Sequence, residues 1–376
     1  MAVIDGATMG QRVADARGRA GLTQADLAQA VSLDRSALAK IENGSRRVSA
    51  LELARIADAV GERIEWFVTQ TPRAILSHRN VREPGSASPS IDRAMEQVAR
   101  NVEFVVEHDN RLELANPSQL RRPNSSEEAE HVAKHARTLL GLDEMQPFLE
   151  AAALAAKIGM LSFSFDLGRD AADAASILLT TGGVAIVNGH LKPGRRRLAL
   201  THELGHYLFA DEYTVDWRIT ELDGDDVWEA RLDRFARAVL LPPEGLRQAW
   251  DELTESGDDL RTVAVKIGSR FRVDMATLAR RLIELHIVPE SDAHQVRPVR
   301  TTGADIVELN LHVSEELSAP SLARRYEEAV LRLYRAETVS AARATDLLFD
   351  EWTEWTEDDL PVLANLPESA IWTFVS

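Results

Sequence analysis

The 376-residue chain contains no cysteine, and aromatic residues make up only 6% of it. The absence of cysteine excludes a disulfide framework and any metal site built on thiolates. No apolar run approaches the roughly 18 to 20 residues that a membrane-spanning helix needs, so no association with a membrane is expected. Asp15, Arg17 and Arg19 interrupt the first apolar positions, which argues against a secretory signal peptide. We therefore expect a cytoplasmic protein of two or three domains.

The chain carries an excess of negative charge, and that excess is unevenly distributed. The formal net charge is −17, which argues against a surface coated for nucleic acid. Residues 9–66 are nearly balanced, with nine basic and eight acidic side chains, whereas residues 301–376 carry five basic and fifteen acidic ones. The acidity therefore lies mainly outside the N-terminal region.

The most informative motif is H-E-x-x-H, formed by His202, Glu203 and His206. On a helix, residues four apart lie one above the other, so both imidazoles can offer nitrogens to one metal ion while Glu203 faces the remaining coordination position. Zinc lowers the pKa of a bound water to about 7, and Glu203 is the candidate general base that takes the proton. The motif therefore predicts Zn²⁺ as cofactor and the hydrolysis of a peptide bond.

The surroundings of the motif support this interpretation. Residues 184–188 predict a short strand, and residues 195–210 predict an internal helix that carries the motif. A catalytic zinc also needs a third protein ligand, for which Glu229 is the candidate, and Asp233 one turn later is placed to accept the free ring N–H of a ligating histidine. The alternative is that these two carboxylates belong to a solvated helix face. The neighbouring motif favours ligation.

The run R-R-L-A-L-T-H-E-L-G-H-Y-L-F at residues 196–209, with residues 229–242 after it, resembles the ImmA/IrrE family of zinc metallopeptidases. The likeness covers roughly residues 125–285. It implies the same three metal ligands, and the known members of the family cut repressor proteins. Two positions depart from the family pattern, because Thr201 and Leu232 stand where alanine is commoner. The larger Leu232 is expected to crowd the helix that carries the third ligand.

The N-terminal region gives a second clear signal. Residues 9–67 predict four or five short helices. Thr23 is expected to cap the helix that follows it, Asp34 is expected to cap the next helix, and Gly44 is expected to end that helix. The series G-L-T-Q-A-D-L-A, S-A-L-A-K-I-E-N-G and L-A-R-I-A-D-A resembles an Xre-type helix-turn-helix over about 60 residues. This resemblance implies that the helix starting after Asp34 enters the major groove of double-stranded operator DNA.

Two groups of side chains are the candidate DNA contacts. The candidates for contacts with base edges are Asp34, Arg35, Ser36 and Lys40. The candidates for contacts with phosphates are Gln24, Asn43, Arg46 and Arg47. The alternative is a helical protein-interaction domain in which the two arginines only solvate a loop. Because the domain is nearly neutral, binding is expected to be weak and salt-sensitive unless two copies bind together, and a homodimer would supply the second copy.

A stretch rich in proline, glycine and serine at residues 84–90 predicts a linker, followed by an amphipathic helix over 91–112. Its apolar residues recur at spacings of four and three, and they are Ile91, Met95, Val98, Val102 and Val105. The spacing is consistent either with a short coiled-coil seam of a dimer or with a helix packed on the peptidase domain. The sequence leaves both interpretations open.

Residues 176–181 and 184–188 predict a hairpin that turns at Gly182 and Gly183. The edge of this hairpin is expected to pair with an extended substrate chain beside the zinc. The residue that stabilises the oxyanion stays open among four candidates, namely Tyr207, Tyr213, His190 and Arg218, although Tyr207 suits core packing better. His131 and His135 are also four residues apart, but nothing acidic lies between them and we expect both at the surface.

The C-terminal part predicts a linker at residues 297–305 and helices over 322–336 and 339–349. An acidic stretch follows, and its three tryptophans are Trp352, Trp355 and Trp372. Aromatic side chains among carboxylates indicate either a partner-binding surface or a small core.

These patterns together predict a mainly α fold with a small β-sheet, of the α+β class. The expected parts are a helix-turn-helix DNA-binding domain at 1–76, a linker at 77–124, a zincin-like metallopeptidase domain at 125–288 and an acidic helical partner-binding region at 289–376. The favoured function is a transcriptional regulator whose zinc endopeptidase cuts a regulatory protein, either the chain itself or a related repressor. One alternative is the antitoxin of a toxin–antitoxin module, which masks a toxin partner through its C-terminal region. Another is a pure repressor with a vestigial metal site.

Overall fold

The computed structural model describes residues 5–60, 64–68, 76–79, 89–209, 225–312 and 315–363. The chain divides into two compact units, Met1–Arg73 and Ala74–Ser376. Both are predominantly helical, and the second contains one small sheet, which confirms the predicted α+β class. Within the described ranges, no helix is long and apolar enough to cross a membrane.

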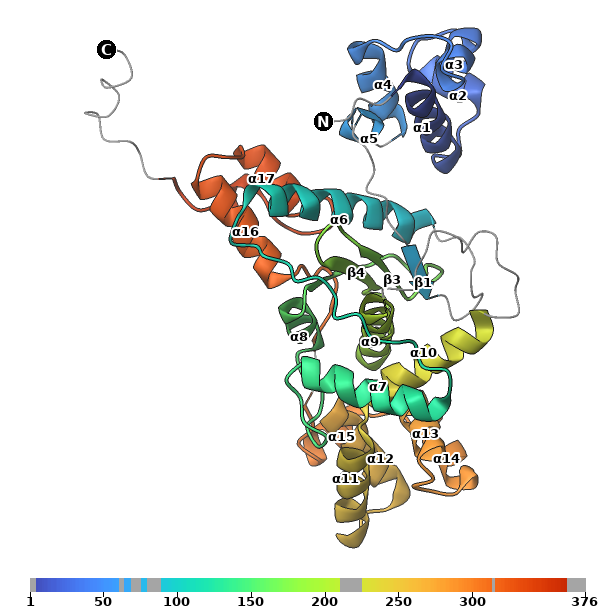
Figure 1. Cartoon of the computed structure of the whole chain (residues 1–376), viewed down its shortest axis with the longest axis vertical. Coiled ribbons are helices and arrows are strands. Elements are labelled where there is room, and N and C mark those ends of the chain that lie inside the picture. Colours follow the sequence, from blue (N-terminus) through green and yellow to red (C-terminus); the bar gives the residue numbers. More distant parts are fainter. Residues whose placement is uncertain are drawn as a thin grey trace, which may run out of the picture. The chain divides into compact units, whose positions relative to one another are not determined.

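The first unit is built from helices around a single core (Figure 1). The helices are α1 (Gly6–Arg19), α2 (Gln24–Ala30), α3 (Arg35–Glu42), α4 (Ala50–Val60) and α5 (Ile64–Val68). Thr23 caps α2 in a capping box with Asp26, and Asp34 occupies the N-cap position of α3. Gly44 follows α3 with φ of +74°, a conformation that glycine adopts without steric cost. The predicted Thr23 cap and the helix stop at Gly44 are confirmed, whereas Asp34 makes no side-chain capping hydrogen bond to α3.

The second unit contains a mixed four-stranded sheet in the order β1-β3-β4-β2. The strands are β1 (Leu76–Arg79), β2 (Met160–Phe165), β3 (Ala174–Leu178) and β4 (Gly183–Asn188). β2 runs parallel to β4, whereas β3 is antiparallel to both β4 and β1. The predicted hairpin is therefore present, but its turn is longer than expected. Gly183 already pairs with Leu178, so residues 179–182 form the connection.

Different helices cover the two faces of this sheet, because side chains alternate along a strand. Leu161, Phe163 and Ile186 belong to one apolar cluster, together with side chains from α6 (Pro89–His108), α16 (Arg324–Arg335) and α17 (Ala341–Leu347). Ala185 and Val187 belong to another cluster, built around α9 (Pro193–Leu208). Figure 1 shows α6 and α9 on opposite sides of the strands.

The apolar stripe of α6 lies inside the core of its own chain. All five of its residues are fully buried, namely Ile91, Met95, Val98, Val102 and Val105. The helix packs on β3, β4 and α16 and ends at His108, four residues before the predicted end. Of the two interpretations that the sequence left open, the structure shows the packed helix.

The C-terminal helices complete the same core. Tyr326 and Val330 of α16 are fully buried, and the Trp352 ring lies 5.1 Å from the Phe165 ring on β2. Trp355 also packs against this cluster, while Trp372 lies outside the described residues. The chain then forms a short 3-10 helix at Glu357–Asp359. Two of the three tryptophans in the acidic stretch thus serve internal packing.

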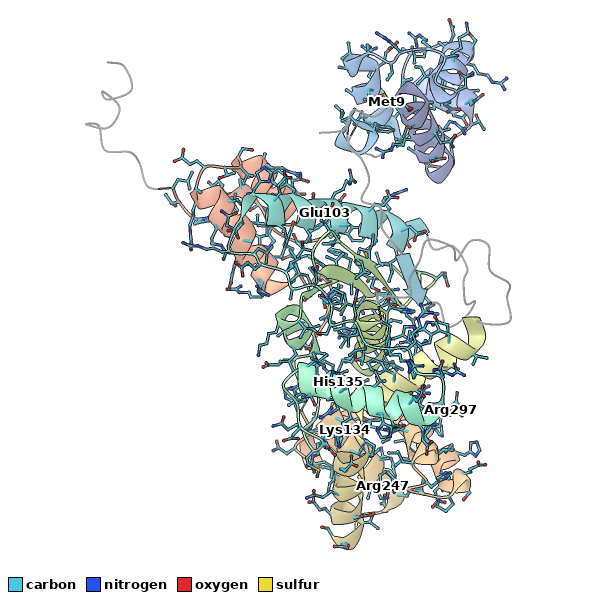
Figure 2. All side chains as sticks on the ribbon, in the orientation of Figure 1. Met9, Glu103, Lys134, His135, Arg247 and Arg297 are labelled. Carbon is cyan, nitrogen blue, oxygen red and sulfur yellow. The ribbon has the colours of Figure 1, made fainter. Side chains whose placement is uncertain are left out.

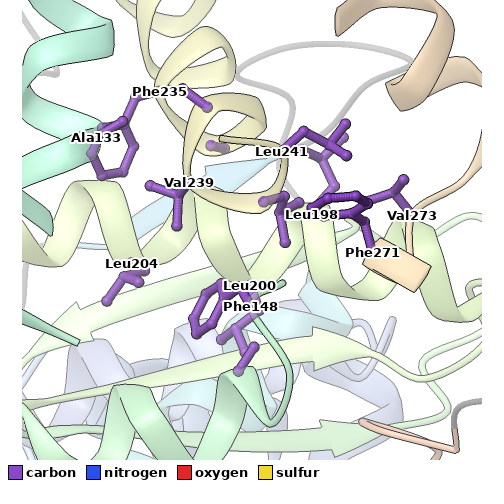
Figure 3. Close-up of a cluster of buried hydrophobic side chains, with 14 of the residues drawn as sticks. Ala133, Phe148, Leu198, Leu200, Leu204, Phe235, Val239, Leu241, Phe271 and Val273 are labelled. Atoms are coloured by element: carbon purple, nitrogen blue, oxygen red, sulfur yellow. The ribbon is translucent and has the colours of Figure 1, made fainter. Parts of the chain in front are cut away.

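The remaining helices lie on the α9 side of the sheet (Figure 1). They are α7 (Ser126–Leu139), α8 (Ala151–Lys157), α10 (Asp225–Leu240), α11 (Pro243–Glu255), α12 (Leu260–Phe271), α13 (Met275–Glu284), α14 (Glu290–Val296) and α15 (Gly303–Glu308). Among them, α8 and α10 contact α9 directly and α7 packs on α10. Leu198, Leu200 and Leu204 of α9 pack in one cluster with Phe235 and Val239 of α10 (Figure 3).

Buried charge fixes three of these helices to one another. The fully buried Arg281 on α13 donates two hydrogen bonds to Glu130 on α7, at 2.6 and 2.7 Å. Arg234 on α10 donates a third to the same carboxylate, at 3.0 Å. Removing one partner of a buried, hydrogen-bonded charge strongly destabilises a protein, so Arg281 fixes α13 to α7. The partly exposed pair of Arg234 and Glu130 adds a contact from α10 to the same group. On the outer side of α7, His131 and His135 are exposed as expected (Figure 2 labels His135).

Candidate metal centre

The candidate ligand helix α9 is buried along most of its length. It begins at Pro193, where the missing proline N–H costs nothing, and every residue from 196 to 208 is buried. His202, Glu203 and His206 are 1%, 0% and 5% exposed. Burying three polar side chains side by side is costly unless each has partners, so their surroundings must supply compensating contacts.

Those contacts come from α10, which crosses beside α9 and brings Glu229 to the two histidines. Glu229 Oε2 lies 3.1 Å from His202 Nε2, and its Oε1 lies 3.7 Å from His206 Nε2. The two Nε2 atoms are 3.2 Å apart. The structure thus brings together the three side chains proposed from sequence as metal ligands, with all three ligand atoms within 4.8 Å of one another.

These distances and this donor set fit a tetrahedral zinc ion. Two ligands that each lie about 2.0–2.1 Å from a tetrahedral ion are about 3.3–3.4 Å apart, close to the observed separations. Two imidazoles and one carboxylate are also the donors of a common catalytic zinc arrangement, which leaves a fourth position open. Glu229 is about one third exposed, so the group is accessible from its side.

Asp233 lies one helical turn beyond Glu229 on α10. Its Oδ1 is 2.9 Å from His202 Nδ1, so the carboxylate accepts the ring N–H while Nε2 of the same ring faces Glu229. A carboxylate in this position fixes the tautomer and orientation of a ligating histidine and makes the ring a better donor. Asp233 thus lies beside His202, and its role in orienting a metal ligand stays a prediction.

Glu203, the candidate base, has a partner that sequence reasoning missed. Ser176 on β3 donates a hydrogen bond from its Oγ to Glu203 Oε2, at 2.6 Å. Ser176 points to the α9 side because it alternates along the strand with Ala175 and Ile177, which belong to the opposite cluster. A neutral donor beside the carboxylate orients it without neutralising it. No local signal in the sequence links a strand serine to a glutamate 27 residues later.

Leu232 departs from the family pattern and is accommodated by Gly205. A Cβ atom on Gly205 would lie 2.4 Å from Leu232 Cδ1, so the glycine between the two histidines lets α10 approach α9 closely. Thr201 is accommodated differently, because its buried hydroxyl donates to the Arg197 carbonyl at 2.8 Å. Neither departure displaces the ligand side chains.

The structure describes two of the four candidates for the oxyanion-stabilising residue, Tyr207 and His190. The Tyr207 hydroxyl lies 2.9 and 3.0 Å from the carbonyls of Ala115 and Ile158, and burial raises the pKa of this phenol well above its usual value. Tyr207 therefore serves the packing role that its sequence context favoured. His190 is half-exposed and lies 3.3 Å from Asp166. Tyr213 and Arg218 lie outside the described residues.

In the first unit, the four candidates for base contacts lie at the exposed start and outer face of α3. Asp34, Arg35, Ser36 and Lys40 are all exposed. Of the phosphate candidates, Asn43 and Arg47 are also exposed, whereas Arg46 is half-buried and donates to Glu52 at 2.7 Å. These positions leave one end and one face of α3 open to a partner.

Gln24 is half-buried and is held by a carboxylate that the sequence analysis did not single out. Its Nε2 donates to Glu42 Oε2 at 2.6 Å, and Arg17 Nε donates to the other oxygen of Glu42 at 2.6 Å. Glu42, at the end of α3, is 9% exposed. The contact fixes the start of α2 against the end of α3, which sets the relative orientation of the two helices.

Two segments of the chain match known protein families. Residues 13–67 match the family described as helix-turn-helix, and residues 157–283 match the one described as IrrE N-terminal-like domain. The second match contains the whole H-E-x-x-H motif, Glu229 and Asp233. No curated protein sequence matches the chain.

Alignments of this chain with two solved structures cover nearly the full length of those structures. The apo form of ComR from S. thermophilus is 14% identical and covers 92% of this chain and 99% of its own, with a TM-score of 0.17. The apo form of ComR from Streptococcus vestibularis is 12% identical and covers 88% and 98%, with a TM-score of 0.16. At such scores the likeness supports no conclusion about this chain. The two family matches do, and the chain combines an Xre-like helix-turn-helix domain with an IrrE N-terminal-like domain of the ImmA/IrrE kind.

Proposed function

We propose that this chain is a DNA-binding regulator whose second unit is a zinc-dependent endopeptidase that cuts a regulatory protein. The convergence of His202, His206 and Glu229 beside the buried Glu203 supports the enzymatic part most directly. A merely structural metal site has no use for a buried carboxylate at its open position. The exposed face of α3 and the helix-turn-helix family match support the DNA-binding part.

In the proposed reaction, the two histidines and Glu229 hold the metal, and Asp233 keeps His202 in the ligating tautomer. A zinc ion held there supplies Lewis-acid polarisation of the peptide carbonyl and acidifies a water molecule. Glu203 takes a proton from the attacking water and passes it to the leaving amine, while Ser176 keeps its carboxylate oriented. The peptide C–N bond breaks as the new C–O bond forms, and the products are a carboxylate and an amine.

In this proposal, DNA binding by the first unit determines where the peptidase acts. Arg35 and Lys40 are exposed on α3, the helix expected in the major groove. A repressor that shares or neighbours the same operator would then be at high local concentration beside the peptidase. A related helix-turn-helix protein is accordingly the substrate class that we propose.

The activity is tested with zinc-loaded protein and a peptide library of broad sequence composition. The wild type is expected to generate new amino termini, and Glu203→Gln is expected to bind zinc equally well but to cut at least about 100-fold more slowly, since a general base contributes about 10²–10⁴. Glu128→Gln, an exposed carboxylate on α7, is the matched control. Equal cleavage by Glu203→Gln would remove Glu203 from the base role.

The antitoxin alternative receives less support from the structure. It requires the C-terminal region to mask a toxin, yet α16, α17, Trp352 and Trp355 pack against the sheet of the same chain.

A further inference from the structure

The edge of the sheet beside the candidate metal centre is covered by a segment of the chain itself. β1, residues 76–79, pairs with the outer side of β3 and contacts α9. From sequence, the free edge of the β3–β4 hairpin is the place where an extended substrate would pair. The structure shows that a piece of this chain occupies that edge.

The register links β1 to the candidate base Glu203 through Ser176. Ser77 lies opposite Ser176, and Ser176 donates its hydroxyl hydrogen bond to Glu203. One strand residue therefore connects the backbone of β1 to the candidate base. The peptide bonds on either side of Ser77 are the ones nearest to that connection.

The pairing has the form in which sheet edges bind extended peptides. β1 runs antiparallel to β3, with Leu76 opposite Ile177 and Arg79 opposite Ala174. Backbone hydrogen bonds hold a peptide added to a sheet edge and require no particular side-chain sequence. β1 is also the last strand on its side of the described sheet, so its other backbone edge carries no further strand there.

β1 lies at the connection between the DNA-binding unit and the rest of the chain. Two residues separate residues 76–79 from the end of the unit Met1–Arg73, which contains the complete helix-turn-helix match. A break in β1 would separate the DNA-binding unit from the metal centre and from α6 onwards. The DNA-binding unit would then lose the second unit covalently attached to it.

We propose that β1 is a substrate of the metal centre that it borders, and that the chain cuts itself within residues 76–79. This inference rests on the proposed endopeptidase function and names a substrate for it. One water molecule is consumed: its oxygen forms the new carboxylate at the end of the N-terminal fragment. Its protons go to the released amine, which begins the C-terminal fragment, and to solvent.

Intact-mass measurement of the full chain tests the proposal. Wild-type protein is purified with chelator, given zinc, and followed over time beside Glu203→Gln. We expect two fragments whose masses place the break after Leu76, Ser77 or His78, and at least about 100-fold slower cleavage in Glu203→Gln. The rate constant should not change over a tenfold range of protein concentration, because the strand belongs to the same chain.

A pair of matched variants separates backbone pairing from side-chain identity. Ser77→Pro with His78→Pro removes two backbone N–H groups, one of which points toward β3 because neighbouring N–H groups alternate, and should abolish self-cleavage. Ser77→Ala with His78→Ala keeps both N–H groups and should still be cut. Equal behaviour of the two pairs would contradict recognition through the strand.

The proline pair also distinguishes failure of this proposal from failure of the endopeptidase. If the zinc-loaded proline pair cuts the peptide library while the wild-type chain stays whole, β1 is not a substrate and the endopeptidase stands. If the proline pair binds zinc and cuts nothing, the endopeptidase function fails and self-cleavage fails with it. Cleavage of the wild type at a position outside 76–79 would also overturn the proposal.

Discussion

The Nδ1 atom of His202 lies 2.9 Å from Asp233 Oδ1, while Nε2 of the same ring lies 3.1 Å from Glu229 Oε2. Both carboxylates come from α10, one turn apart. A single helix therefore supplies the third candidate ligand and the group that fixes the tautomer of the first. This arrangement explains why the position of α10 matters as much as the motif on α9.

Asp233→Ala should weaken zinc binding without changing the three candidate ligands. Loss of a carboxylate behind a ligating histidine costs about 10- to 100-fold in metal affinity. Competition with a fluorescent chelator measures this change. Asp251→Ala on α11, an exposed carboxylate, is the control and should bind zinc as the wild type does. Unchanged affinity in Asp233→Ala would show that the His202 contact does not support metal binding.

Ser176→Ala should slow hydrolysis while leaving zinc content unchanged. The variant loses the 2.6 Å hydrogen bond to Glu203 and no contact to the candidate ligands. We expect a fall of about 10-fold in kcat/KM on the peptide library, which corresponds to about 1.4 kcal/mol and lies just below the roughly 1.5–3 kcal/mol of a hydrogen bond to a charged group. Ser162→Ala, a buried serine on β2 of the same sheet, is the matched control. A fall of the same size in both variants would indicate a general packing defect.

Gly205→Ala should destabilise the second unit through Leu232. The added Cβ would sit 2.4 Å from Leu232 Cδ1, and overpacking of this kind costs about 1–3 kcal/mol. Leu232→Ala alone leaves a cavity, at about 2–5 kcal/mol. In the double variant each change relieves the other, so its loss in the free energy of unfolding should be smaller than the sum. Additive losses in urea denaturation would contradict the close contact.

Arg35→Ala and Lys40→Ala should each weaken specific DNA binding by about 1–3 kcal/mol, the usual worth of a good base contact. Fluorescence anisotropy with a duplex selected by the wild-type chain measures the loss. Arg55→Ala on α4 removes an exposed positive charge away from α3 and serves as control. If all three variants lose affinity equally, the contribution is general electrostatic attraction and α3 does not read bases.

The sequence predicted those features that depend on local spacing. His202 and His206 share a helix face because they are four residues apart, Thr23 caps a helix through its immediate neighbours, and the stripe from Ile91 to Val105 identified an amphipathic helix. Glu229, which lies on another helix, was the candidate third ligand because a catalytic zinc needs one, and the family resemblance implies the same residue.

The features that the sequence did not predict depend on contacts between distant segments. Ser176 meets Glu203 only after β3 packs on α9, and the pairing of Ser77 with Ser176 joins strands about a hundred residues apart. Strand pairing over such a separation leaves no periodic signal. Glu42 of α3 was not singled out from the sequence, and the structure shows it buried with Arg17 and Gln24 converging on it. The domain boundaries proposed from sequence stay predictions.

Zinc content per chain tests the central claim most directly. Wild-type protein, His202→Ala and His131→Ala are incubated with excess zinc, freed of unbound metal and measured by elemental analysis. His131 is exposed on α7 and so controls for adventitious binding to a histidine. We predict about one zinc per chain in the wild type and in His131→Ala, and a loss of that zinc in His202→Ala. Zinc retained in His202→Ala, or no zinc in the wild type, would contradict the metal centre formed by His202, His206 and Glu229.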